Sequence, residues 1–240
     1  MHLKSVLLSL SAVAALSASV ANAIPLITNG NFELTTNGTN KQLASSPTTA
    51  SDRTTLTGWT SSNGNDGGYN FVLDSRIITT SASAIGLKNY SSSTSHGNVF
   101  ASDALWYPGK LSQNIFGLNV GDTYELTFDY ALGQQAGFDG ANKNNYWQVG
   151  FGKDIQNSAM LTIDNGGFSG WKTASMTFKA TSVSQVLSFL ALGSSPGAPP
   201  FMLLDNVSMQ AVPEPSTLSL MLGGVGLVGF LARRRRKSKA

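Results

Sequence analysis

The stretch TYELTFDYA, residues 123–131, decides the fold class because its side chains alternate in character along the whole segment. Large apolar or aromatic side chains occupy every second position, and Glu125, Thr127 and Asp129 stand between them. A period of two places successive side chains on opposite faces of a β-strand. The preceding GLNVG, residues 117–121, has the glycines of a turn. The stretch therefore predicts a strand with one buried face and one solvated face.

The same alternation recurs along the chain, so several more strands are predicted. Gly, Asn and Ser separate these segments, and none of them shows the apolar stripe of a helix. Together they predict an all-β fold, a two-sheet antiparallel jelly-roll sandwich. The further strand segments are residues 146–151, 171–180, 186–192 and 200–210.

One folded domain is expected over residues 24–210, which is long enough for a single sandwich. Two polar stretches interrupt it, at residues 35–57 and at SSNGNDGG, residues 61–68. The first contains only Leu43 and Leu56 as large apolar residues. Both stretches are therefore predicted to be surface loops that bury too little to form strands.

The first 23 residues have the pattern of a secretory signal peptide. Lys4 precedes an apolar stretch at residues 6–20, and Ala21-Asn22-Ala23 fits the small-residue rule of signal peptidase cleavage. We expect the processed protein to begin at Ile24. The chain has no cysteine, so packing and bound metal, rather than disulfides, are expected to stabilise the exported domain.

The last segment, residues 211–240, differs in composition from the rest. Val212-Pro213-Glu214-Pro215 is followed by an apolar run at residues 218–232 and by Arg233, Arg234, Arg235 and Arg236. Fifteen helical residues span only ~22 Å, against a hydrocarbon core of ~30 Å, and the Arg cluster is expected to stay in the cytoplasm. The run therefore predicts a short transmembrane helix that is cut away, with a permanent single-span anchor as the alternative.

The charge of the chain is unevenly distributed. Seven of the sixteen Lys and Arg residues lie in the two end segments, whereas twelve of the thirteen acids lie within residues 24–210. The formal charge of +3 for the whole chain thus becomes −3 for the domain, which keeps nine basic residues. No basic stripe interleaved with aromatics occurs in the domain, so nucleic acid is not an expected partner.

No catalytic residues are predicted. His96 is the one histidine downstream of the signal, and no thiol and no G-x-S-x-G turn is present. A glycosidase needs two carboxylates across a cleft, and the spacing of the acids selects no such pair. The sequence thus indicates a non-enzymatic protein, with an envelope polysaccharide hydrolase as the less favoured alternative.

Asp205 is the acid whose position is least expected. Alternation puts it on the same side of the last strand as Phe201, Leu203, Val207 and Met209, where an unpaired carboxylate is unfavourable. It therefore needs a cation or several hydrogen-bond donors.

Glu33 lies in the first predicted strand, which runs beside the last one in many sandwiches, so the two acids could share a Ca²⁺ ion. Hydrogen bonds to backbone N–H groups, or to Asn31 and Asn206, are the alternative.

Trp106 and Tyr107 are candidate carbohydrate-binding residues. They precede Pro108-Gly109, so they are expected to project from a loop. Sugar rings stack on the faces of such side chains, while amides and acids hold the hydroxyls. Trp59, Trp147 and Trp171 are instead predicted to pack in the interior.

The tail resembles the PEP-CTERM sorting signal, in which a Val-Pro-Glu-Pro box precedes a Gly- and Leu-rich helix and an Arg-rich end. This resemblance implies processing by an exosortase of the inner membrane. It also implies a surface or exopolysaccharide-associated protein of a Gram-negative bacterium.

The domain resembles galactose-binding-like jelly rolls and carbohydrate-binding modules. The resemblance rests on NGNFE at residues 29–33, Gly58-Trp59, the central strand, and PPFMLLDNVSM at residues 199–209. It implies a structural Ca²⁺ site at the positions of Glu33 and Asp205. The sugar-binding residues of such modules vary, so none is carried over.

These observations lead to one expectation and its alternatives. The chain is expected to be an exported, non-enzymatic protein of the cell surface or extracellular matrix that binds, or is embedded in, extracellular polysaccharide. A structural or adhesive component of a biofilm without a specific glycan site is the first alternative.

Overall fold

The computed structural model describes residues 25–92, 97–194, 197–213, 223–226 and 228. The predicted signal peptide, His96, Glu214, Pro215, the Arg cluster and most of the apolar run lie outside these residues. Residues 223–226 and 228 are helical. Among the described residues, no helix has both the length and the apolar character needed to cross a membrane.

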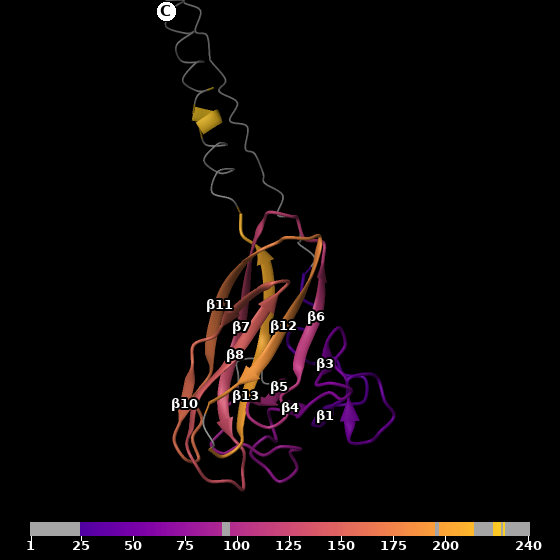
Figure 1. Cartoon of the computed structure of the whole chain (residues 1–240), viewed down its shortest axis with the longest axis vertical. Helices are drawn as coiled ribbons and strands as arrows, with labels where there is room; N and C mark the ends of the chain where they lie inside the picture. The colour runs from indigo at the N-terminus through magenta and orange to yellow at the C-terminus, as the bar shows by residue number, and fades with distance from the viewer. Residues whose placement is uncertain (1–24, 93–96, 195–196, 214–222, 227, 229–240) are drawn as a thin grey trace, which may run out of the picture.

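The described domain is built from two packed β-sheets, as predicted (Figure 1). One sheet has seven strands in the order β11-β7-β13-β5-β4-β1-β2, and the other has the order β10-β8-β12-β6-β3 with β9 beside β8. All pairs are antiparallel except β1 with β2. The strands are β1 Lys41–Leu43, β2 Arg53–Thr54, β3 Thr60–Ser62, β4 Asn70–Asp74, β5 Asn98–Asp103, β6 Lys110–Phe116, β7 Thr123–Gln134, β8 Asn142–Phe151, β9 Asp154–Asn157, β10 Leu161–Ile163, β11 Lys172–Lys179, β12 Ser184–Leu192 and β13 Pro200–Ala211.

The main core lies between the sheets and is rich in aromatic rings. Trp147 on β8 is fully buried and stands edge-on to Phe189 of β12, with ring centroids 6.2 Å apart. Its Nε1–H donates to the Leu203 carbonyl across the core at 3.0 Å. Trp59 is also buried in this core, so the interior packing predicted for both residues is confirmed.

A second apolar cluster covers the outer face of the seven-stranded sheet. Outward side chains of β4, β5, β7 and β13 pack there against Ile78, Ile85 and Leu87, which belong to the segment between β4 and β5. Trp171 packs at the margin of this cluster, partly buried. The long segment after β4 therefore acts as a third layer over part of one sheet.

The loop prediction for the two polar stretches is wrong in part. The first contains β1 and β2, which extend the seven-stranded sheet, and the second overlaps β3. Leu43 and Leu56 are the physical reason, because they are 1% and 3% exposed and reach the main core. Buried Thr54 packs beside them, so two apolar residues suffice to hold short strands at the sheet edge.

The face predicted for the last strand is also wrong in part. Phe201 and Leu203 join the outer cluster, whereas Val207 and Met209 point into the main core. The register shifts between Asp205 and Ser208 because a bulge interrupts β13 there. The bulge forms where the first segment crosses β13, since the Val207 N–H donates to the Gly30 carbonyl at 2.9 Å.

Strand β13 defines the two ends of the sandwich. Its twelve residues separate these ends by ~40 Å, at ~3.3 Å per residue. We call the end at Pro200 the tail-distal end; it is formed by the β5–β6, β7–β8 and β12–β13 connections. We call the end at Ala211 the tail-proximal end; it is formed by the β6–β7 and β11–β12 turns (Figure 1).

Candidate functional site

The β5–β6 connection carries Trp106 and Tyr107 at the tail-distal end, as exposed residues. The side chain of Asp103, at the end of β5, fixes this loop. Its Oδ1 accepts the backbone N–H of Leu105 at 2.9 Å and that of Trp106 at 3.0 Å. Because Asp103 is only 1% exposed and Trp106 is 70% exposed, a buried acid holds an exposed indole in place.

The same loop is held from its other side by the Gly- and Asn-rich stretch before β4. Tyr107 has a left-handed backbone, with φ of 51°, and its carbonyl accepts the Tyr69 N–H at 2.8 Å. The Asn63 amide donates to the Pro108 carbonyl at 2.9 Å. Gly68 lies so close to Gly109 that a Cβ there would come within 2.6 Å of its backbone. The polar stretch therefore braces the aromatic loop.

A surface hollow of about 320 Å³ opens beside Trp106. Trp106 and half-exposed Phe138 provide aromatic surface, and Asp103 and Gln135 provide polar groups. Tyr69 and Pro199 complete the lining. Four separate connections meet at this point, so the hollow combines apolar surface with hydrogen-bonding groups.

The loop that carries Phe138 is fixed as firmly as the Trp106 loop. The Phe138 carbonyl accepts the Lys88 ammonium at 2.7 Å and the Gln134 side-chain amide at 2.6 Å. Lys88 also forms an ion pair with Asp139 at 2.9 Å. The hydrogen bond and the positive charge of Lys88 hold the pKa of Asp139 below its usual value.

Burial raises the pKa of the Asp103 carboxyl, and the two loop N–H groups oppose that shift. Desolvation is the larger effect, because the carboxyl lies behind the hollow with no cationic partner among the described residues.

Sequence reasoning selected Trp106 and Tyr107 as candidates but missed the residues that surround Trp106 in the structure. Asp103 carries a usable signal, because an Asp at the end of a strand commonly accepts N–H groups two and three residues further on. Gln135 and Phe138 carry no such signal, since only the folding of the β7–β8 connection brings them near Trp106.

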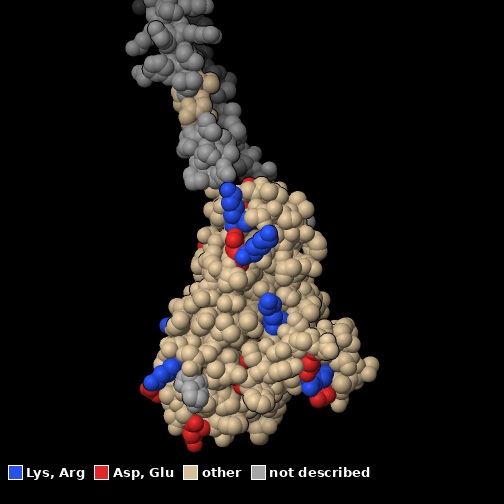
Figure 2. All heavy atoms as spheres, in the orientation of Figure 1, with Lys and Arg blue, Asp and Glu red and all other residues tan. Residues whose placement is uncertain are grey.

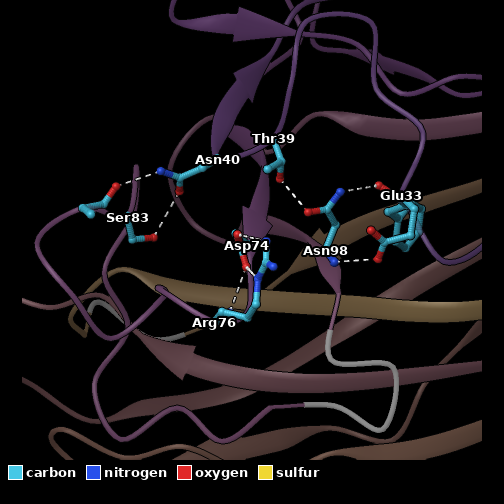
Figure 3. A network of polar contacts seen from close by, with 9 residues as sticks. Glu33, Thr39, Asn40, Asp74, Arg76, Ser83 and Asn98 are labelled. Carbon is cyan, nitrogen blue, oxygen red and sulfur yellow. Dashed lines mark hydrogen bonds and ion pairs between the residues drawn. The ribbon is translucent and has the colours of Figure 1, made fainter.

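The prediction that Glu33 lies in the first strand is wrong, because residue 33 belongs to no strand and β1 begins only at Lys41. The Glu33 Oε1 accepts the backbone N–H of Asn98, the first residue of β5, at 2.7 Å (Figure 3). The Asn98 side chain in turn donates to the Phe32 carbonyl at 3.1 Å and accepts the Thr39 hydroxyl at 2.6 Å. For Glu33, the backbone hydrogen bond that was the alternative to metal binding is therefore present.

Asp205 is fully buried, and its Oδ1 accepts the N–H of Asn206 at 2.8 Å. The β13–β7 register places it directly opposite Asp129, whose carboxylate accepts the Asn206 amide at 2.9 Å and the Thr173 hydroxyl at 2.6 Å. Directly opposite residues on antiparallel strands share a face of the sheet. Sequence reasoning missed Asp129, which lies on the polar face of the strand predicted at residues 123–131.

These acids offer the hard oxygen donors that calcium prefers. Asp205 and Asp129 stand side by side on β13 and β7, and Glu33 is bound at β5, the strand on the other side of β13. Within the described ranges, no group of three or more His, Cys, Asp or Glu side chains that could hold a metal is found. Ca²⁺ at Glu33 and Asp205 stays a prediction.

The strand β13 leads directly into the C-terminal segment. Val212 still belongs to the sandwich edge, since its N–H donates to the Thr123 carbonyl at 2.8 Å, and Pro213 follows it. Residues 211–236 match the sequence profile of the PEP-CTERM protein-sorting motif. These residues are a PEP-CTERM sorting motif.

The PEP-CTERM motif begins at the last residue of β13, so almost no spacer separates it from the folded domain. The motif indicates export and sorting to the surface of a Gram-negative cell. The recognition of this tail from its sequence is thereby confirmed.

The sandwich is similar to solved structures of low sequence identity. One is described as "CBM4 structure and function", with 16% identity, 78% of this chain and 99% of that chain covered, and a TM-score of 0.33. Another is TmCBM61 in complex with β-1,4-galactotriose, with 11% identity, 79% and 100% covered, and a TM-score of 0.32. A third is the enzymatically active domain of tailspike protein 4 of bacteriophage CBA120, with 12% identity, 79% and 22% covered, and a TM-score of 0.39.

A search of curated protein sequences finds no match to this chain. The structural similarities include both carbohydrate-binding modules and a chain with enzymatic activity. They provide no positive indication of catalysis by this chain.

Proposed function

We propose that this chain is an exported, non-enzymatic surface protein that binds extracellular polysaccharide in the hollow beside Trp106. The sorting motif supports delivery to the cell surface, and the tail-distal hollow supports binding of a sugar polymer. The observation that carries the proposal is the rigid exposure of Trp106, which is 70% accessible while its loop is fastened to buried Asp103.

The chemistry of the hollow suits a sugar better than an apolar ligand. The C–H face of a pyranose ring packs on an indole or phenyl ring, and its hydroxyls need donors and acceptors in the same plane. Trp106 and Phe138 supply the rings, and Asp103 and Gln135 supply the polar groups. The hollow is open at the surface beside exposed Trp106 and Phe138, so a long chain can pass across it without having to end there.

Delivery follows from the two terminal segments. Signal peptidase removes the first 23 residues, and an exosortase acts on Val212-Pro213-Glu214-Pro215 while residues 218–232 hold the chain transiently in the inner membrane. The protein then resides at the cell surface or in the extracellular matrix. The intact mass of surface-extracted protein tests this step, because recovery of Arg233–Arg236 contradicts processing.

The position of the hollow agrees with this route. It lies at the end of the sandwich that is ~40 Å from Ala211, at ~3.3 Å for each residue of β13. A domain held through its C-terminal segment therefore presents Trp106 away from the point of attachment, toward the extracellular matrix.

The binding test compares matched aromatic substitutions at the two ends. The full chain, purified in a mild detergent, is screened on a glycan array and then titrated with the best polysaccharide. Trp106→Ala is expected to weaken binding about fivefold or more, because stacking on one aromatic ring contributes at least ~1 kcal/mol. Phe116→Ala is the control, since Phe116 is similarly exposed at 68% but lies at the tail-proximal end.

Equal affinity of the Trp106→Ala variant and the unchanged protein contradicts the site. Absence of binding to any glycan favours the alternative, a structural or adhesive matrix component. Turnover of a polymer that depends on one carboxylate favours the hydrolase alternative.

A structural Ca²⁺ ion at Glu33 and Asp205 is a separate part of the proposal. If the ion joins the first segment to β13, EDTA is expected to lower the melting temperature and added Ca²⁺ to restore it. Asp205→Asn is expected to abolish the response to EDTA. An unchanged melting temperature in EDTA, with no metal found by elemental analysis, excludes the ion.

A further inference from the structure

Large apolar side chains are also exposed at the tail-proximal end. The residues are all aliphatic except one, and they come from the β6–β7 and β11–β12 turns, from the neighbouring ends of β6 and β12, and from the segment after β13. We call them the proximal patch: Phe116, Val120, Val183, Val186 and Val212, which are 68%, 62%, 64%, 46% and 38% exposed.

Three residues of the proximal patch lie side by side on β6 and at the start of β12. Phe116 pairs with Ser184, so Val183 comes just before the residue opposite it, and Val186 is its diagonal neighbour on the same sheet face. The Leu118 N–H donates to the Val183 carbonyl at 3.1 Å, which ties the two turns together. Contiguous exposed apolar surface of this kind usually marks an interaction site.

Both terminal segments join the domain at this same end. Pro25 and Leu26, the first described residues, line a surface hollow of about 540 Å³ together with Phe116. At the other terminus, Val212 is bonded to Thr123 at the start of β7. The predicted signal peptide and the sorting segment therefore connect to the domain beside the proximal patch.

The connection to the apolar run is short. Leu218 lies six positions after Val212, and a fully extended chain covers at most ~22 Å over that distance, at ~3.6 Å per residue. The polar layer on each side of a bilayer is ~5–8 Å thick, and the extended segment must cross one such layer. With residues 218–232 in the hydrocarbon, the end of the sandwich stays within ~15 Å of the membrane surface.

Charges at this end suit an interface better than a dry protein contact. Lys153 and Asp154 lie at the β8–β9 turn, Lys179 at the end of β11 and Asp122 in the β6–β7 turn, and all are exposed except half-buried Asp122. Figure 2 shows basic and acidic side chains together at the upper end of the sandwich. Lys side chains at the same end as exposed aliphatic ones are typical of surfaces that enter the headgroup region of a membrane.

We propose that the proximal patch docks on the lipid bilayer while the sorting segment is still attached. This inference rests on the membrane intermediate of the proposed function. Docking fixes the height and orientation of the Pro-Glu-Pro box at the membrane face, where an intramembrane enzyme can reach it. Cleavage removes the covalent connection, so the remaining contact of five side chains is weak and the domain leaves the membrane.

The absence of cysteine makes the test direct. Val183→Cys and, separately, Val120→Cys are labelled with a polarity-sensitive fluorophore in the full chain. Phe138→Cys, which is 47% exposed at the tail-distal end, is the matched control. Each protein is reconstituted into phosphatidylethanolamine–phosphatidylglycerol vesicles, with or without lipids that carry a quencher near the headgroup.

We expect the labels at Val183 and Val120 to be quenched at least twofold more than the label at Phe138. Equal quenching at the two ends, in a protein that floats with the vesicles, overturns the docking surface but leaves the membrane-held tail intact. Failure to float overturns both the docking and the membrane intermediate. Shielding of the Val183 label in lipid-free detergent, at concentrations that give dimers, assigns the proximal patch to a second copy of the chain instead.

Discussion

The two ends of the sandwich both expose large apolar side chains but differ in the chemistry of these side chains. The tail-distal end presents aromatic rings from Trp106, Tyr107 and Phe138 beside the polar groups of Asp103 and Gln135. The tail-proximal end presents mainly valine side chains. Flat rings with polar neighbours suit a sugar ring, whereas aliphatic tips suit a lipid interface.

The ends also differ in how their loops are held. Side-chain hydrogen bonds hold the tail-distal loop, since Asp103 accepts two of its backbone N–H groups and Asn63 donates to its Pro108 carbonyl. The tail-proximal turns combine backbone hydrogen bonds, such as the Gly121 N–H to the Ala180 carbonyl at 2.8 Å, with side-chain ones, such as the Thr181 N–H to Gln185 Oε1 at 2.6 Å. The comparison teaches that side chains hold both ends, whereas glycine backbone packs against glycine backbone at Gly68 and Gly109 but not in the β6–β7 turn.

Glycine substitutions should give the largest difference between the ends. Gly68 and Gly117 both have left-handed backbones, with φ of 78° and 76°. A Cβ at Gly68 would lie 2.6 Å from the Gly109 backbone, whereas nothing lies within 4 Å of one at Gly117. We expect Gly68→Ala to lower the free energy of unfolding by about 2–4 kcal/mol and Gly117→Ala by about 1 kcal/mol. Urea denaturation of the full chain measures both, and equal losses contradict the bracing.

Removal of the Asp103 carboxyl should have the next largest effect. Asp103→Ala leaves the N–H groups of Leu105 and Trp106 without their acceptor, at an expected cost of about 1–3 kcal/mol in unfolding free energy. Polysaccharide binding should fall as well, because the Trp106 loop loses its fixed position. Asp103→Asn is the control, since its amide oxygen can accept the same two hydrogen bonds. If Asp103→Ala binds and unfolds like Asp103→Asn, the carboxyl does not organise the loop.

The pH dependence should give the smallest effect. Burial raises the pKa of Asp103 above its unfolded value, so the folded state binds this proton more tightly. Its contribution to stability is therefore fully present below the unfolded pKa of 3.8 and is lost as the pH rises through the higher folded pKa. Asp103→Asn lacks this titration, so its stability relative to the unchanged protein should rise as the pH increases from the unfolded pKa of 3.8 through the higher folded pKa. If the difference in stability between Asp103→Asn and the unchanged protein does not change with pH, the prediction that a buried Asp103 carboxyl ionises in the folded state is contradicted.

The fold could be predicted from sequence where one strand faces both core and solvent. Residues 123–131 alternate because the main core takes Leu126 and Phe128 while solvent takes the positions between. Strands β1 to β3 escaped prediction because a two- or three-residue strand is too short to show a period. The face of β13 changes at a bulge that depends on contact with Gly30, far away in sequence.

Only those residues of the candidate site that carry a signal in their local sequence could be predicted. Adjacent Trp106 and Tyr107 before Pro-Gly indicate an exposed loop from sequence alone. Phe138 and Gln135 join them through the pairing of β7 with β13, which no local pattern encodes. The partner of Asp205 was missed for the same reason, since only the strand register places Asp129 opposite it.

Hydrogen–deuterium exchange of the full chain with and without its bound polysaccharide tests the central claim most directly. Polysaccharide binding at the tail-distal hollow predicts slower exchange in residues 104–109 and 135–141, with unchanged exchange in residues 117–122 and 180–183. Protection confined to the tail-proximal turns, or to the exposed face of the six-stranded sheet, would contradict the assignment of the binding site.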